Sequence, residues 1–360
     1  MKITDIKAVS IDLGPAERPY GDAGLMNQKR VFGYVEVFTD AGLTGFCPGA
    51  ATPSVVEGDL KQVLVGENPL EIERIWTRLF QGWRHPKMDE ALTISKVDIA
   101  IWDIIGKALG QPTWRLLGGA RRQVPAYGAG GMYQVGKDVD ELVREMLGFV
   151  EDGFRAVKMK VAGAPLKEDV ARVRAVREAI GPEVELLIDA NHAWTPYEAI
   201  LFARAVEDQR VYWLEEPVYP WDYRGCAEVA RVLDIPVATG ENVTLLAPFR
   251  DLIDARAADI IQADPLYCGG ITEWRKIAAY AQAHNLPMAP HGNPHIGAHC
   301  VAAVPNGLIV EVGMYAGRRP ARPPIVAPLT VVDGTITLSD EPGHGFVIDR
   351  DAIRWNMEHQ

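Results

Sequence analysis

Ionisable and amide side chains follow a series of short apolar segments along this chain. Each ends a segment rich in Val, Ile, Leu and Ala, or comes within about two residues of its end. They are Lys158, Lys160, Asp189, Asn191, Glu215, Glu241, Asp264, His291 and Glu311. In a parallel barrel the carboxyl ends of the strands open into one cavity, where the catalytic residues of barrel enzymes lie. The pattern therefore predicts that these side chains meet in a single site.

Three of these residues are carboxylates that follow consecutive segments. Asp189, Glu215 and Glu241 form a set of hard oxygen ligands that leaves positions for substrate oxygens, as Mg²⁺ prefers. A single acidic residue is more often a helix N-cap or one half of a surface ion pair. Three at consecutive strand ends favour a cation, because without one they would repel each other. The sequence predicts one bound Mg²⁺ in the site.

Two lysines lie two residues apart on one apolar segment. Lys158 and Lys160 therefore point to the same face of a strand, and the apolar Val157, Met159 and Val161 would face the surrounding helices. The opposite register would turn the lysines toward those helices instead. A buried lysine beside another cation has a lowered pKa, and its neutral amine can act as a base.

A histidine and an aspartate end two neighbouring segments. Asp264 is close enough along the predicted sheet to hydrogen-bond one ring nitrogen of His291 and so select which nitrogen faces the substrate. His295 and His299 come later, on a predicted helix, and we expect them to be structural.

Apolar segments alternate with helical patterns over residues 121–325. We expect strands at 124–127, 156–161, 185–189, 211–215, 237–239, 260–262, 288–290 and 309–311. Helical periodicity separates them at 139–151, 166–180, 195–206, 224–233 and 272–284. This alternation is typical of an α/β fold with a parallel sheet, here a (β/α)₈ barrel of the TIM type.

The two ends of the chain have a different character. Residues 1–120 combine strand patterns before residue 47 with helical periodicity at 55–65, 70–81 and 88–109, and we interpret them as an α+β capping domain. The stretch 14–27, rich in Pro and Gly, is predicted to be a mobile loop. In the segment 326–360 we expect a hairpin that leaves the barrel and returns to the capping domain.

Several motifs together resemble one family. They are Lys158-Met159-Lys160, Asp189-Ala190-Asn191, Leu214-Glu215-Glu216-Pro217, Gly240-Glu241-Asn242, Asp264 before Gly269-Gly270, His291 and Glu311. With these motifs the chain resembles the mandelate racemase subgroup of the enolase superfamily. Residues 95–107, 116–119 and 342–345 resemble further family signatures in the capping domain and the tail, so the likeness covers nearly the whole chain.

The resemblance implies a role for each residue. Asp189, Glu215 and Glu241 would bind Mg²⁺, with Glu216 beside them. Lys160 would be the base on one face of the substrate, and His291, oriented by Asp264, the acid or base on the other. Lys158, Asn191 and Glu311 would contact the substrate, with Lys158 at its carboxylate and Glu311 as a protonated hydrogen-bond donor to it. The common step would be removal of the proton next to a carboxylate, which needs strong charge stabilisation.

The same residues permit three fates for the resulting enediolate. Loss of a β-hydroxyl would dehydrate a sugar acid to a 2-keto-3-deoxy acid, reprotonation would racemise or epimerise a 2-hydroxy acid, and ring opening or closure would isomerise a sugar-acid lactone. We favour dehydration, because it is the commonest outcome among relatives with this lysine and histidine arrangement. A non-catalytic binding protein on the same barrel is a further alternative, although such a protein would be expected to lack at least one of these groups.

Polar residues in the predicted loop are candidates for substrate recognition. Arg18, Tyr20 and Asp22 suit a hydroxylated substrate better than an aromatic one, although the loop could equally cover the site or form a subunit contact. Arg318, Arg319 and Arg322 are candidates for a second carboxylate of a diacid or for solvated surface charge.

Composition excludes some partners. The net charge of −11 and the lack of a Lys/Arg block argue against nucleic acid, and no apolar run is long enough for a membrane span. Four cysteines without paired spacing argue against a zinc module or a disulfide framework. We expect a cytoplasmic protein, and the family resemblance implies a homo-oligomer whose partner is a small carboxylate, a sugar acid.

Overall fold

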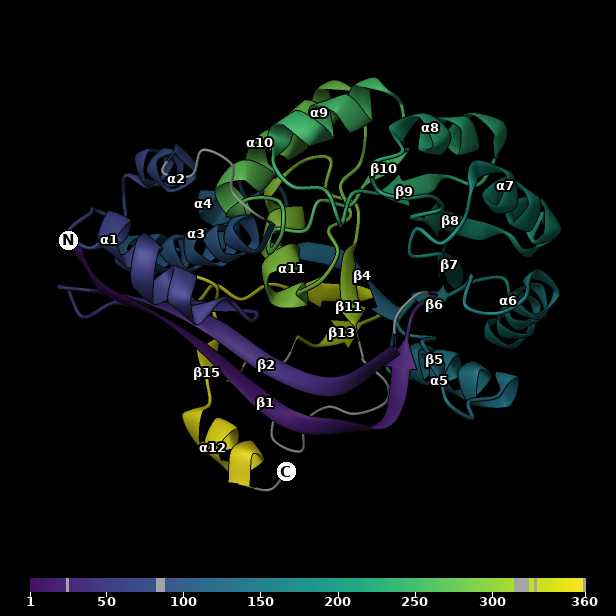
Figure 1. The fold of residues 1–360 in the computed structure, drawn as a ribbon, viewed down its shortest axis with the longest axis horizontal. Coiled ribbons are helices and arrows are strands. Elements are labelled where there is room, and N and C mark those ends of the chain that lie inside the picture. The colour runs from purple at the N-terminus through teal and green to yellow at the C-terminus, as the bar shows by residue number, and fades with distance from the viewer. Residues whose placement is uncertain (24–25, 82–87, 314–323, 327–328, 359–360) are drawn as a thin grey trace.

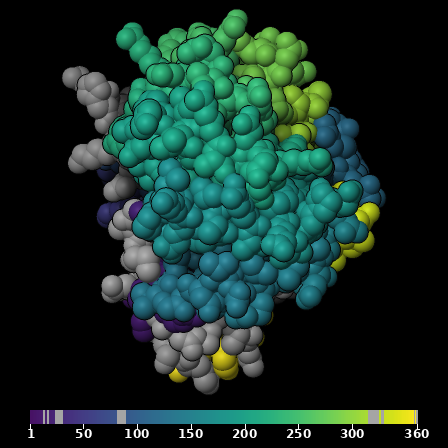
Figure 2. All heavy atoms as spheres, turned by 90° about the vertical axis from the view of Figure 1, so that its right-hand side faces the viewer, coloured from purple at the N-terminus to yellow at the C-terminus, as the bar shows by residue number. Residues whose placement is uncertain are grey.

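A computed structural model describes residues 1–23, 26–81, 88–313, 324–326 and 329–358, and it contains a cap and a barrel (Figure 1). The cap comprises an antiparallel sheet and the helices before the barrel, coloured purple to blue. The barrel follows in teal and green, and its helices make up most of the face seen in Figure 2.

The cap sheet is built on two long antiparallel strands. Its order is β3-β2-β1-β5, with bounds β1 Ile3–Gly21, β2 Met26–Thr39, β3 Thr44–Pro48 and β5 Tyr133–Gln134. The predicted loop at 14–27 is wrong for most of its length, because residues 14–21 belong to β1. Their backbone pairs with β2 on one side, and Tyr20 and Gly21 pair with β5 on the other. Residues 24–25 of that loop lie outside the described part.

The cap helices follow the sheet in the order that the periodicity predicts. They are a π-helical turn Val55–Leu60, α1 Lys61–Leu64, α2 Ile72–Gln81, α3 Met88–Leu109 and α4 Thr113–Leu116. Helix α3 approaches the tail so closely that a Cβ on Gly106 would lie 2.5 Å from the Cα of Gly343. Glycine is therefore needed where the cap meets the C-terminal segment.

The barrel strands lie where the sequence predicts them. They are β4 Gln123–Ala129, β6 Ala156–Lys160, β7 Glu185–Asp189, β8 Val211–Glu215, β9 Val237–Thr239, β10 Ile260–Ile261 and β11 Val310–Gly313, all paired in parallel. The segment expected to be the seventh strand is reduced to isolated bridges from Met288 to Ile261 and Gly307. Because β11 pairs with β4, the sheet closes.

Helices connect these strands around the outside. They are α5 Val139–Glu151, α6 Leu166–Ile180, α7 Pro196–Ala205, α8 Tyr223–Val232, α9 Leu246–Asp254, α10 Gly270–Ala283 and α11 Pro294–Ala303, with a 3₁₀ turn at Glu207–Gln209. The start of α7 shows why such segments are helical, since Thr195 and Glu198 form a reciprocal capping box before Pro196. None of the helices in the described ranges combines the length and the apolar character needed to cross a bilayer.

Strand alternation divides the barrel into two apolar layers. Val157, Met159 and Val161 pack toward the helices, as predicted. The lumen layer is a separate cluster of Tyr127, Ala129, Ala156, Leu187, Trp213, Ala238, Ile260, Ala289 and Ile309. Residues two positions further along these strands continue on the same face, and several of them are the predicted site residues.

The tail contacts the barrel first and the cap afterwards. The hairpin of β13 Val331–Val332 and β14 Thr335–Thr337 pairs with β4, so it stays on the barrel, contrary to prediction. The elements β12 Ile325–Val326 and β15 Val347–Ile348 pair with each other, and α12 Arg350–Glu358 follows. An ion pair from Arg350 to Glu36 of β2 then ties α12 to the cap.

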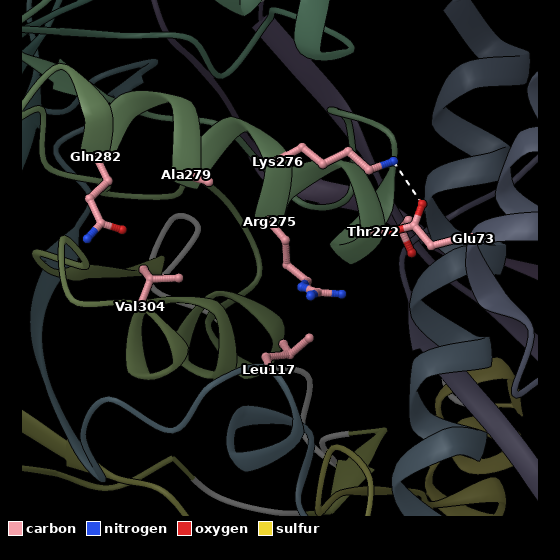
Figure 3. Close-up of a pocket in the computed structure, with 8 residues that line it drawn as sticks. All are labelled: Glu73, Leu117, Thr272, Arg275, Lys276, Ala279, Gln282 and Val304. Atoms are coloured by element: carbon pink, nitrogen blue, oxygen red, sulfur yellow. Dashed lines mark ion pairs between the residues drawn. The ribbon is translucent and has the colours of Figure 1, made fainter.

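A pocket of about 350 Å³ lies between the cap and the outer side of α10 (Figure 3). An ion pair of 3.0 Å between Lys276 and Glu73 joins α10 to α2 at its edge. The lining residues are Glu73, Leu117, Thr272, Arg275, Lys276, Ala279, Gln282 and Val304. None of the residues predicted for the catalytic site lines this pocket.

A buried histidine pair joins α11, α4 and the tail. His299 Nδ1 accepts a hydrogen bond from the Trp114 backbone N–H at 3.1 Å, so its Nε2–H donates to the His344 carbonyl at 3.0 Å. His344 in turn donates from Nε2 to the Ile99 carbonyl at 2.9 Å, and Thr113 donates to its Nδ1 at 3.1 Å. Both rings are therefore neutral, and His299 has the structural role that the sequence predicts.

Acidification is expected to destabilise the protein through His295 and His299, two histidines of α11. Burial and the neighbouring His344 lower the pKa of His295 to about 4 and that of His299 to about 3, from an ordinary value of 6.5. The unfolded chain therefore binds protons that the folded protein does not. This stability is complete above pH 6.5 and is lost as the pH falls toward 4, by up to about 1.4 kcal/mol per pH unit for each histidine.

Urea unfolding at several pH values in this window measures the effect. His299→Gln, which does not titrate, should reduce the dependence of the free energy of unfolding on pH. His284→Gln, at an exposed position, is the matched control. Equal slopes in the His299 variant and the wild-type protein would contradict the assignment.

Candidate active site

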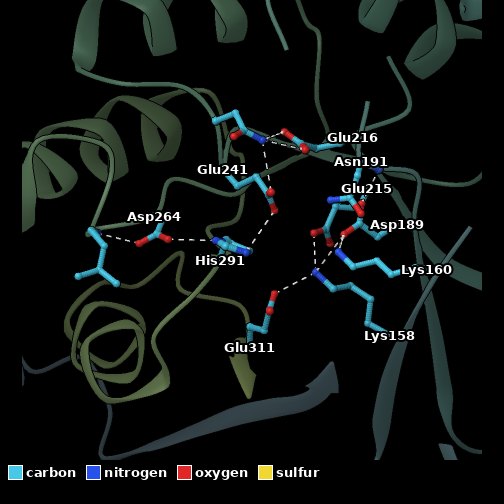
Figure 4. A network of polar contacts seen from close by, with 12 residues as sticks. Lys158, Lys160, Asp189, Asn191, Glu215, Glu216, Glu241, Asp264, His291 and Glu311 are labelled. Carbon is cyan, nitrogen blue, oxygen red and sulfur yellow. Dashed lines mark hydrogen bonds and ion pairs between the residues drawn. The ribbon is translucent and has the colours of Figure 1, made fainter. Parts of the chain in front are cut away.

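Three carboxylates from consecutive strand ends meet at the top of the barrel lumen (Figure 4). Ligand oxygens of Asp189, Glu215 and Glu241 all lie within 4.8 Å of one another. We call these three residues the acidic triad. Burial raises the pKa of Glu215 to about 8, an effect that Lys158 opposes and the other two triad carboxylates reinforce. Three ionised carboxylates in this buried space are therefore costly unless positive charge lies among them.

The geometry fits a hard divalent cation. Glu241 Oε2 is buried and has no hydrogen-bond partner among the described residues. The other two carboxylates are held in place, since the Asn191 backbone N–H donates to Asp189 at 2.8 Å and the Trp213 indole N–H donates to Glu215 at 3.0 Å. These hydrogen bonds would orient the carboxylates that bind a cation.

The two lysines point into the lumen beside the triad. Lys158 Nζ lies 2.9 Å from Glu311 and 3.7 Å from Asp189, and it also donates to Glu215. Lys160 donates to Asp189. Figure 4 shows both side chains reaching the same group of carboxylates from one wall of the barrel.

The charge state of these lysines differs from the prediction. Burial lowers the pKa of Lys160, but the attraction of Asp189 raises the pKa by more. The pKa of Lys160 therefore lies above its ordinary value. The pKa of Lys158 is raised well above its ordinary value because Glu215 and Glu311 outweigh the effect of burial. The spacing of two lysines could not reveal that each has a carboxylate partner. A cation on the triad would compete with both ammonium groups for these oxygens, which lowers the cost of losing a proton.

Glu311 shows a related difference. Burial raises the pKa of its carboxyl, but Lys158, His291 and Lys160 lower it to about 2 overall. In this arrangement Glu311 is a carboxylate rather than the protonated donor that the resemblance implies. It can take up a proton only if Lys158 turns to another anion, such as the carboxylate of a substrate.

His291 and Asp264 form a pair on the opposite wall. His291 Nδ1 lies 3.0 Å from Asp264 Oδ2, and Asp264 also accepts from the Leu266 backbone N–H at 2.7 Å. Nδ1 therefore carries a proton, and Nε2 faces the triad, 3.6 Å from Glu241. Burial lowers the pKa of His291, but the carboxylates of Glu241, Glu311 and Asp264 raise it well above its ordinary value.

Amide side chains complete the site. The Asn191 side-chain oxygen is buried and has no hydrogen-bond partner in the described part of the chain. Asn242 donates to both oxygens of Glu216, at 2.9 and 3.0 Å, and to Glu241 at 3.3 Å. Gln262, which the sequence prediction missed, is fully buried, and neither of its amide atoms is paired within the described residues. Its place two residues before Asp264 was the signal that could have identified it.

The loop candidates lie at the contact between cap and barrel. Arg18 donates to the Val135 carbonyl at 2.9 and 3.1 Å and to Glu141 of α5 at 2.6 Å. Tyr20 is half-buried, and its backbone pairs with Gln134. The structure therefore shows Arg18 bound to the protein itself, and substrate contact by either residue stays a prediction. Arg318, Arg319 and Arg322 lie outside the described residues.

Comparison with known families matches nearly all of this chain. Residues 6–118 match the mandelate racemase/muconate lactonizing enzyme N-terminal domain, and residues 140–352 match the enolase C-terminal domain-like family.

Similar proteins include enzymes that act on sugar acids. A 3,6-anhydro-α-L-galactonate cycloisomerase from Streptomyces coelicolor is 37% identical, over 85% of this chain and 83% of its own length. An arabinonate dehydratase from Saccharolobus solfataricus is 33% identical, over 88% of each chain. A solved structure of L-talarate/galactarate dehydratase from Salmonella typhimurium, liganded with Mg and L-lyxarohydroxamate, has a TM-score of 0.88 and 30% identity, over 98% of this chain and 92% of that one.

Addition of Mg²⁺ should stabilise the folded protein through the acidic triad. At a concentration 100 times Kd, a ligand that binds only the folded state adds about 2.7 kcal/mol to the free energy of unfolding. We expect Glu241→Gln to remove most of this gain, whereas Glu207→Gln, at an exposed position, should retain it. Denaturant unfolding with Mg²⁺ or with EDTA measures the gain, and an equal gain in both variants would place the cation elsewhere.

Proposed function

This chain belongs to the mandelate racemase and muconate lactonizing enzyme family of the enolase superfamily, and we propose that it is a Mg²⁺-dependent sugar-acid dehydratase. The reaction removes the proton next to the substrate carboxylate and then expels the β-hydroxyl, which yields a 2-keto-3-deoxy acid.

One observation carries this proposal: a lysine and a histidine flank the acidic triad from opposite walls. Lys160 contacts Asp189 at one end of the triad, and His291 Nε2 lies 3.6 Å from Glu241 at the other (Figure 4). A substrate bound over the triad would present one face to each group. The complete set of ligands, base and acid also argues against a non-catalytic binding protein.

The residues of the site divide the work of binding and proton transfer. Asp189, Glu215 and Glu241 would hold Mg²⁺, which when bound neutralises negative charge developing on the substrate carboxylate. Lys158, between Glu215 and Glu311, is placed to bind the same carboxylate, and Glu311 would supply a further hydrogen bond to it.

Two side chains would move the protons. Lys160 Nζ, once neutral, takes the α-proton and leaves the electron pair in the enediolate. His291 gives its Nε2 proton to the β-hydroxyl, which departs as water, and the enol product then tautomerises to the keto acid. Asp264 holds His291 in the required orientation through Nδ1.

Cycloisomerisation of a sugar-acid lactone is the second candidate. It is favoured by the cycloisomerase of Streptomyces coelicolor, which is 37% identical to this chain. The proton-abstraction step would be the same, and only the leaving or entering oxygen would differ. Racemisation or epimerisation of a 2-hydroxy acid would use the same pair of residues without loss of oxygen.

The proposal also covers location and assembly. A cytoplasmic site of action agrees with four cysteines that are buried as free thiols. The partner would be a small sugar acid rather than nucleic acid. The homo-oligomer expected from the sequence remains a prediction, which light scattering can test.

Incubation with a panel of sugar acids and their lactones in D₂O tests the reaction. Proton NMR should show a 2-keto-3-deoxy product that forms with Mg²⁺ and stops when EDTA is added. Ring opening or closure without loss of water would identify the second candidate instead. Turnover that continues at full rate in EDTA would refute the metal-dependent scheme.

Variants of the two proton-transfer residues should separate their roles. Lys160→Ala should lower kcat by about 10²–10⁴-fold, since general acid–base groups contribute on that scale. His291→Asn should stop water loss but keep Lys160-dependent exchange of the α-proton with D₂O. Lys167→Ala, an exposed lysine on α6, is the control and should match the wild-type enzyme. Full activity in a Lys160→Ala, His291→Asn double variant would exclude this site.

A further inference from the structure

Three charged residues of the site and two aromatic residues of the layer beneath it form a closed ring of contacts, which we call the lumen ring. Tyr127 O–H donates to Glu311 Oε2 at 2.8 Å, and Lys158 donates to the same oxygen at 2.9 Å. Lys158 also donates to Glu215 Oε1, while the Trp213 indole N–H donates to Glu215 Oε2 at 3.0 Å. The Tyr127 and Trp213 rings meet edge to face, with centroids 5.3 Å apart, and close the ring.

We propose that Tyr127 and Trp213 are positioning residues with separate tasks. Tyr127 orients the Glu311 carboxyl that binds the substrate carboxylate, and Trp213 orients the Glu215 carboxylate that binds the cation. This assignment builds on the function proposed above, because it takes the roles of Glu311 and Glu215 from it.

The contacts of Tyr127 decide which oxygen of Glu311 is available. Both donors, the tyrosine hydroxyl and the Lys158 ammonium, act on Oε2. The Tyr127 hydroxyl still occupies Oε2 when Lys158 turns to a substrate, so Oε1 is the oxygen that is left for a proton and for the substrate. Lys158 lies 5.4 Å from the centre of the Tyr127 ring, so the same side chain also supports the ammonium group.

The contact of Trp213 acts on the metal ligand in the same way. An indole N–H can only donate, so Trp213 occupies Oε2 of Glu215 and fixes the orientation of the carboxylate. Oε1, which accepts from Lys158, would then be the oxygen left for a cation. Trp213 is fully buried and precedes Glu215 by two residues on β8, so ring and carboxylate lie on one face of the strand.

Comparison with their neighbours in the lumen layer indicates that Tyr127 and Trp213 do more than fill space. Leu187, Ile260 and Ile309 fill the same layer without any polar side-chain atom. A buried hydroxyl or indole N–H needs a partner, and both donors here end on carboxylates of the site.

Four variants test the two tasks. Tyr127→Phe and Trp213→Phe each remove one donor and keep an aromatic ring. Tyr212→Phe and Trp114→Phe are the matched controls, since Tyr212 contacts Trp213 from the same strand and Trp114 donates to the Ser339 backbone carbonyl in the tail. The readouts are Mg²⁺ affinity by calorimetry, oxalate affinity of the Mg²⁺-loaded protein, and kcat and KM on any substrate that the wild type turns over. Oxalate is the probe because it is a planar dianion, as the enediolate is.

We expect each variant to change a different readout. Trp213→Phe should weaken Mg²⁺ binding by about 10–100-fold, the usual cost of removing a hydrogen bond behind a metal ligand. Tyr127→Phe should leave Mg²⁺ affinity within about threefold of wild type but lower kcat and oxalate affinity by about tenfold or more. Both controls should match the wild type.

Two outcomes would overturn the assignment. One is that neither variant changes its own readout. The other is that both variants lose Mg²⁺ and oxalate binding together, which is the result expected of a purely structural core. A wild-type protein that binds Mg²⁺ and oxalate but turns over no sugar acid would refute the proposed function instead, and the separate binding readouts of the two variants would still decide this assignment.

Discussion

Carboxylates can share a buried space only if positive charge lies among them, and this constraint organises the barrel lumen. Asp189, Glu215 and Glu311 each contact Lys158 or Lys160, which explains why both lysines are held as ammonium groups. A cation on the acidic triad would take over part of that task. Metal binding would therefore be linked to the lysines. It would release a lysine ammonium group from its carboxylate and so make that lysine easier to deprotonate, ready to accept the α-proton.

The alternation and register of the strands place each lysine beside its carboxylate partner. Between β6 and β7 five consecutive residue pairs are in register, and this register places Lys160 directly beside Asp189. In the hydrophobic cluster below, Tyr127 and Trp213 each donate a hydrogen bond to a carboxylate of the site. The cap joins this arrangement through β5, which follows the first barrel strand and pairs with β1.

Much of this arrangement could be predicted from local sequence. The period of two around Lys158 predicted which side chains enter the lumen, and residues at strand ends predicted the acidic triad and the pair of His291 and Asp264. Long-range partners could not be predicted in this way. The strand at 14–21 depends on pairing with β2 and β5, and the raised pKa of Lys160 depends on a carboxylate 29 residues away. Gln262 and the lumen ring were missed because their roles depend on residues on other strands.

The reduced seventh strand gives the barrel two walls that differ in the length of their backbone pairing. The lysine wall is held by continuous ladders, whereas the wall that leads to His291 is held at Met288 by single bridges to its neighbours. We expect a substitution near Met288 to move His291 more readily than it moves Lys160, which lies on the other wall. Evolution can therefore retain the first chemical step and retune the second, so the weakly bridged wall is where one enolate-forming scaffold would diverge into different reactions.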